Sequence, residues 1–136
     1  QDRMIKFGIL IQNKCYLCQQ KEETLEHLYC ECMFSRKCLI ELEQWSKLKL
    51  PEKNCIQCWL HLRRKSLLEK QCIGMILAAL MCCSWMEINN SGILEKVQRP
   101  EVLMKNMIAT LKIRLQWSIS TTNRKCKSDW LDNILM

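Results

Sequence analysis

Thiols and an imidazole gather near the start of the chain in an order that suits metal binding. Cys15 and Cys18 are separated by two residues, and His27 follows with Cys30 and Cys32 close behind it. Two thiols at this spacing can hold one metal ion from a tight turn, and an imidazole with a further thiol can complete a tetrahedral site. We therefore predict a small knuckle that holds one structural zinc ion.

Two thiols compete for the fourth position in this site. The sequence from Glu22 predicts a helix, because acidic residues occupy its first turn. His27 and Cys30 are three residues apart and share one face of a regular helix. His27 and Cys32 are five apart and point roughly 140° away from each other. Cys32 can therefore serve only if the helix loosens after Tyr29, and spacing alone favours Cys30.

The residues from Arg3 to Ser35 also resemble a known family. Their order of Cys-x2-Cys, Glu-Thr, His-Leu-aromatic and Cys-x-Phe-Ser is similar to the zinc-binding domain that follows the reverse transcriptase in plant LINE-type (non-LTR) retrotransposons. The resemblance implies four ligands, Cys15, Cys18, His27 and Cys32. Cys30 then stands where the family usually has an apolar or aromatic residue. We choose Cys32 as the fourth ligand on this ground and keep Cys30 as the alternate.

Composition favours helices over sheets. The 136 residues include only 3 Gly and 2 Pro, and 49% of them are hydrophobic, which leaves little turn chemistry for a many-stranded sheet. We predict a mainly α fold in which a small N-terminal zinc knuckle packs on an irregular helical domain. Residues 1–50 form the knuckle module with its flanking helices, and residues 51–136 form a basic helical segment.

Apolar periodicity predicts where the helices lie. The expected elements are a short helix within 2–11 that Asp2 can cap and Gly8 can end, a helix at 34–50 with Ser35 as its N-cap, an apolar helix at 72–86, a turn at 89–92 and a helix that begins at Pro100. The apolar stretch at 72–86 is shorter than the ~20 residues that span a bilayer, so we expect a buried central helix there. The last helix carries an apolar stripe of Met104, Ile108, Leu111 and Leu115.

The remaining cysteines indicate the compartment and a weaker second site. An odd total of 11 cysteines, with Cys82 and Cys83 adjacent, favours a reducing, intracellular location over a disulfide framework. A second Cys-x2-Cys pair, Cys55 and Cys58, lies just before His61 and could bind a second metal ion. We favour the interpretation that these two thiols are small buried side chains of an amphipathic helix.

Positive charge is concentrated in the second part of the chain. The formal net charge is +7, and residues 54–136 contain 12 Lys and Arg against 6 Asp and Glu. The densest basic cluster contains Arg63, Arg64, Lys65 and Lys70. This distribution favours a polyanionic partner, RNA or DNA, that is held through its phosphates.

Catalytic motifs do not occur in the sequence. It contains no Gly-rich phosphate loop, no adjacent Asp pair of a polymerase palm and no Ser/His/Asp constellation. We expect a non-catalytic, zinc-binding C-terminal portion of a retrotransposon reverse transcriptase-like protein, with the enzyme upstream. Its expected partners are RNA or DNA and the upstream reverse transcriptase domain, without a membrane or a small-molecule substrate. The alternative is a decayed or co-opted helical scaffold with structural zinc that acts in protein–protein interaction.

Overall fold

The structure, a computed structural model, describes residues 6–8, 13–51, 60–94, 97–121 and 134. Its elements include a π-helix and three longer helices: η1 (His27–Glu31), α2 (Met33–Ser46), α4 (Leu67–Leu94) and α5 (Pro100–Thr121). An antiparallel bridge joins Lys14 and Glu22 near the start. Over the described residues the fold is therefore helical with a small N-terminal knuckle, which confirms the predicted fold class. The predicted division after residue 50 stays a prediction.

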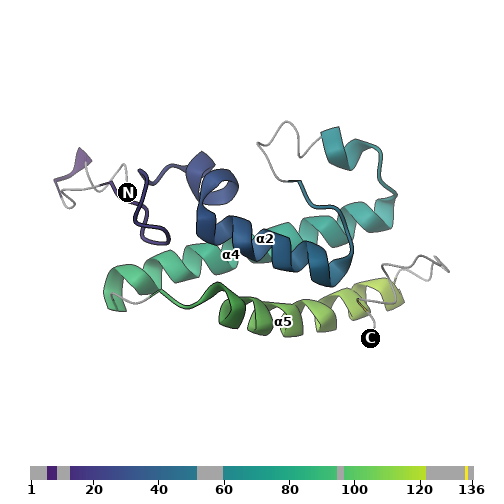
Figure 1. The fold of residues 1–136 in the computed structure, drawn as a ribbon. Coiled ribbons are helices and arrows are strands. Elements are labelled where there is room, and N and C mark those ends of the chain that lie inside the picture. Colours follow the sequence, from purple (N-terminus) through teal and green to yellow (C-terminus); the bar gives the residue numbers. More distant parts are fainter. Residues whose placement is uncertain (1–5, 9–12, 52–59, 95–96, 122–133, 135–136) are drawn as a thin grey trace.

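The two longest helices form an antiparallel pair. In Figure 1, α4 runs in one direction and α5 returns beside it after a short connection, while α2 lies across them. Contacts join α4 to α5 and α2 to both of these helices. The N-terminal knuckle and η1 lie at the end of α2 where that helix begins. The knuckle is thus placed on the helical part rather than apart from it.

The core lies where these helices meet. Its fully buried side chains include Leu42 of α2, Ile73 and Ile76 of α4, and Met104 and Leu115 of α5. The stripe predicted on the last helix is confirmed, because its other members Leu111 and Ile108 are buried and half-buried against the same core. Burial of these stripes supplies the main driving force for holding the helices together.

The predicted ends of the second helix were wrong. α2 begins at Met33 with Cys32 as its N-cap, and the Ser35 hydroxyl donates to the carbonyl of Leu28 at 2.6 Å instead of capping the helix. The helix ends at Ser46 because Lys47 has a left-handed φ of 55° and donates its N–H to the Glu43 carbonyl. A residue in that conformation turns the chain out of the helix.

The central helix is longer than predicted, and the predicted turn at 89–92 was wrong. α4 continues through these residues to Leu94. Two buried polar side chains in this part of the helix have partners inside the fold: Ser91 donates to the Glu87 carbonyl at 2.6 Å, and the Glu87 carboxylate accepts the backbone N–H of Gln98. Because these buried polar groups have hydrogen-bond partners, the helix can continue through this stretch instead of ending in a turn.

By length and composition alone, α4 is also long enough to cross a membrane. The core helix of a soluble protein can have the same length and composition. A stripe on α4 that includes Leu68, Ile76 and Leu80 is buried in the core with α2 and α5.

Of the helix predicted within 2–11, only residues 6–8 are described, and Gly8 there has a φ of 68°, which favours glycine.

Candidate metal centre

The first two thiols lie in a tight knuckle whose two arms are paired. One hydrogen bond runs from the Cys15 N–H to the Lys21 carbonyl, and another runs from the Glu23 N–H to the Asn13 carbonyl, both at 2.9 Å. These backbone hydrogen bonds hold the two arms side by side, as in a short β-hairpin. The first thiol is thereby fixed at the base of the knuckle.

A turn between the arms brings the second thiol back toward the first. Gln19 adopts a left-handed φ of 58° and donates its N–H to the Cys15 carbonyl at 2.8 Å. The two residues between the thiols are Tyr16 and Leu17, and the Leu17 side chain is buried in the core. The turn therefore lets Cys15 and Cys18 face one metal ion, which a spacing of two residues allows.

A wide helical turn brings the other two side chains together. η1 is a π-helix, and the Cys32 N–H donates to the His27 carbonyl at 2.6 Å, five residues back. In a regular helix these residues point to different sides, but a π turn closes between residues five apart. His27 and Cys32 therefore stand at the two ends of one turn. The wider turn thus meets the condition under which Cys32 can act as a ligand.

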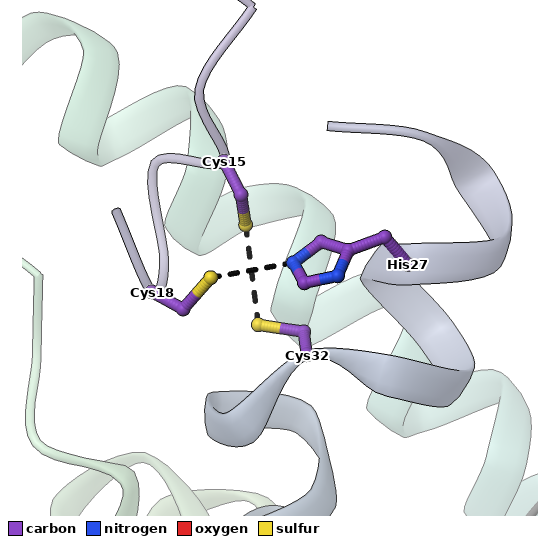
Figure 2. Close-up of side chains that lie close together, drawn as sticks. All are labelled: Cys15, Cys18, His27 and Cys32. Atoms are coloured by element: carbon purple, nitrogen blue, oxygen red, sulfur yellow. Dashed lines mark hydrogen bonds between the residues drawn. The ribbon is translucent and has the colours of Figure 1, made fainter. Parts of the chain in front are cut away.

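The four side chains converge on one point. Figure 2 shows Cys15, Cys18, His27 and Cys32 directed toward a common centre, and their sulfur and nitrogen atoms all lie within 4.8 Å of one another. The Cys15 and Cys32 sulfurs are 3.9 Å apart, and the Cys18 sulfur is 3.3 Å from His27 Nε2. Zinc–sulfur bonds of about 2.3 Å at tetrahedral angles separate two sulfurs by about 3.8 Å. The donor set and its spacing thus fit one zinc ion.

Cys30 lies outside this group of four. It is half-buried in η1, one residue before the turn ends, while Cys32 is fully buried among the other three side chains. The structure therefore brings together the residues that the family resemblance implied and not the pair that regular helical spacing favoured. The ligand role of each side chain is a prediction that this geometry supports.

Burial indicates a structural site. Cys15 and Cys32 are fully buried, His27 is only 4% exposed, and the two thiols belong to the same core as Leu28 and Phe34. Four protein side chains would fill the coordination shell of zinc, whereas a catalytic zinc keeps one position open for water or substrate. A closed site in the core stabilises the fold.

The three thiols differ in how easily they lose a proton. Burial raises the pKa of Cys15 to about 12 and also raises the pKa of Cys32. Burial acts in the same direction on Cys18, but the backbone N–H groups of Gln20 and Lys21 and the neighbouring imidazole outweigh it and lower its pKa to about 7. Thiolates are the ligands of zinc, so binding must displace protons from the two buried thiols.

The residues predicted to bind nucleic acid lie near the start of α4, at the end of the helix that is away from the metal centre. Arg63 and Arg64 are exposed, and with Lys65 they border an open hollow of about 770 Å³. Lys65 is half-buried and forms an ion pair with Glu69 at 3.4 Å, and Lys70 is half-buried in the first turn of α4. Figure 1 shows the segment that contains the two arginines at the opposite end of the helices from the knuckle.

The second metal site suggested by the sequence is only partly visible. Cys55 and Cys58 lie outside the described residues. His61 is described, and its Nε2 atom lies 2.8 Å from the carbonyl oxygen of Lys49, to which it must donate because a carbonyl only accepts. In the parts of the chain that the structure describes, the Cys15 cluster is the one group of side chains suited to a metal ion.

One feature of the surface was missed from the sequence. An apolar groove of about 530 Å³ lies between α4 and α5. Its lining includes Met75, Ala79, Cys82, Met86 and Met107. Met75, Ala79, Cys82 and Met86 recur at helical spacing, which indicates a second apolar face on α4. This pattern is hard to recognise in the sequence because most of the neighbouring residues are apolar too.

Comparison with known proteins agrees with the geometry of the cluster. Residues 1–38 match a family model described as zinc-binding in reverse transcriptase. No curated protein and no solved structure matches the chain. The matched residues include the knuckle, η1 and the start of α2, and with them all four clustered side chains. Residues 1–38 are therefore similar to the zinc-binding region associated with reverse transcriptases, and the cluster within them is consistent with a site for one zinc ion.

Proposed function

We propose that this chain is the non-catalytic, zinc-binding C-terminal portion of a reverse transcriptase-like protein of a plant LINE-type retrotransposon, and that it contacts RNA or DNA inside the cell. The observation that best supports this proposal is the cluster of Cys15, Cys18, His27 and Cys32 within a region that matches a reverse transcriptase-associated family. Because four protein ligands leave no open coordination position, the zinc ion would stabilise the fold and not take part in catalysis. The function is then binding, beside an upstream polymerase domain.

Charge supports a nucleic-acid partner. The net charge of +7 gives the chain a general attraction for polyanions. Arg63 and Arg64 are exposed beside an open hollow, and both guanidinium groups are suited to phosphate oxygens. Lys65 borders the same hollow, and its ammonium group pairs with Glu69.

Salt dependence tests this proposal. The zinc-loaded chain is titrated with single-stranded RNA and DNA between about 50 and 200 mM salt, and binding should weaken linearly on a log–log plot. The double variant Arg63→Gln, Arg64→Gln should reduce the slope by about 1.4, since each neutralised phosphate accounts for about 0.7 on a single strand. Undetectable or salt-independent binding by the zinc-loaded chain would reject the proposal.

A matched control separates a local contact from net charge. Arg99 and Lys105 are also exposed, but they lie at the start of α5, which follows the end of α4, whereas Arg63 and Arg64 precede the start of α4. The double variant Arg99→Gln, Lys105→Gln removes the same charge as the first variant. We expect it to change the slope much less, and an equal change would show that only total charge matters.

The apolar groove favours a second candidate function, a helical scaffold that binds protein. Met86, which lines the groove, is 54% exposed. Large exposed apolar patches often mark protein interfaces. A Met86→Glu variant that loses binding to a protein partner while its zinc content and helicity stay unchanged, together with no RNA or DNA binding by the wild type, would support this function.

A further inference from the structure

A carboxylate lies beside the ring nitrogen of His27 that faces away from the metal centre. Nε2 points at the Cys18 sulfur, 3.3 Å away, so it is the nitrogen suited to bind zinc. The other nitrogen, Nδ1, is buried without a hydrogen-bond partner. The Oε2 atom of Glu31 lies 3.9 Å from Nδ1. Glu31 reaches this position because it lies one helical turn after His27.

A lysine of the knuckle contacts the same carboxylate oxygen. Lys21 Nζ lies 3.3 Å from Glu31 Oε2. The Lys21 backbone carbonyl also accepts the N–H of Cys15, so this residue is fixed within the knuckle. Glu31 therefore connects the turn that carries the first two thiols with the turn that carries His27.

We propose that Glu31 is a positioning residue for the zinc site, which accepts a hydrogen bond from His27 Nδ1–H when the metal is bound. An imidazole that binds zinc through Nε2 carries its proton on Nδ1, and a carboxylate at that proton fixes the tautomer and the ring orientation. The distance of 3.9 Å exceeds a hydrogen bond. Glu31 is 52% exposed, so rotation of its side chain can close the remaining gap.

Zinc affinity of the full chain tests this role, independently of any nucleic acid. Competition with a chelator measures the dissociation constant of wild type, Glu31→Ala and Glu31→Gln. The alanine variant should bind zinc about 10- to 100-fold more weakly, the usual effect of removing such a partner. Glutamine keeps an acceptor oxygen, so its effect should be smaller. Equal affinity of the alanine variant and wild type would overturn the proposal.

A control variant and a second readout separate positioning from general charge. Glu26 is an exposed acid in the same segment, and Glu26→Ala removes the same charge without touching Nδ1. A loss of affinity equal to that of Glu31→Ala would refute a specific role. By nuclear magnetic resonance of the zinc-loaded chain, the Nδ1 proton of His27 should exchange slowly with water in wild type and faster in Glu31→Ala. Unchanged exchange would also refute it.

Discussion

At the scale of single residues, the site depends on which thiol follows His27 at the right distance. The residue types and the Cys-x2-Cys spacing were enough to predict three members of the cluster. The fourth could not be chosen by spacing, because periodicity assumes a regular helix and the chain forms a π turn with a hydrogen bond from Cys32 to His27. The family resemblance chose Cys32, and the structure brings that residue to the other three.

Two serine variants distinguish the competing thiols. Cys32→Ser should abolish stoichiometric zinc binding, because it removes one of four converging donors from a fully buried position. Cys30→Ser should keep one zinc per chain, because Cys30 lies outside the cluster. Native mass spectrometry counts the metal in both. Zinc retained by Cys32→Ser and lost by Cys30→Ser would reverse the assignment.

At the scale of elements, the start of α4 is fixed by a reciprocal pair of hydrogen bonds. The Glu69 N–H donates to the Ser66 hydroxyl at 3.2 Å, and the Ser66 N–H donates to the Glu69 carboxylate at 3.0 Å. This is a capping box, whose Ser-x-x-Glu pattern is visible in the sequence. The sequence prediction followed the apolar residues alone and began the helix five residues late. It also ended the helix early, since partners such as Gln98 for Glu87 appear only in the fold.

Removal of the cap should destabilise the chain measurably. Ser66→Ala deletes the hydroxyl acceptor and should lower the free energy of unfolding by about 1 kcal/mol. Urea unfolding of the zinc-loaded proteins measures the difference. Ser120→Ala is a suitable control, because Ser120 is exposed near the end of α5 and its hydroxyl bonds only within its own helix. Similar destabilisation in both variants would contradict a capping role.

The same cap should make stability depend on pH. Burial raises the pKa of Glu69, but the Ser66 N–H and hydroxyl and the Lys65 ammonium outweigh it and hold this pKa below its usual 4.5. A lowered folded-state pKa gives stabilisation that is present above the unfolded value and is lost as pH falls through the folded value.

Comparison of wild type with Glu69→Gln isolates this contribution. Zinc loss in acid affects both proteins alike, so the difference between their unfolding free energies reports on Glu69. That difference should be largest at about pH 6 to 7 and should shrink as the pH falls below about 4.5. Urea unfolding at several pH values measures it. A difference that stays constant, or grows in acid, would contradict a stabilising role for the ionised Glu69 carboxylate.

At the scale of the whole molecule, the knuckle and the helices share one core. The composition was enough to predict a helical fold, since few glycines and prolines leave little turn chemistry. It could not predict how α2, α4 and α5 pack, because a helix such as α4 has more than one apolar face and the sequence does not show which face meets which. The groove between α4 and α5 is a result of that packing.

Although they share one core, removal of zinc should affect the two parts of the molecule differently. The knuckle is too small to bury a core of its own, so metal ligation supplies much of its folding free energy. The α4–α5 pair has buried side chains such as Ile73, Ile76 and Met104 that do not involve the metal centre. After chelation, backbone amides at 13–32 should lose protection from hydrogen exchange, while amides in the middle of α4 and α5 should keep most of theirs. Re-addition of zinc should restore the first group. Uniform loss of protection across all helices would instead mean that the zinc region and the helices unfold as one cooperative unit.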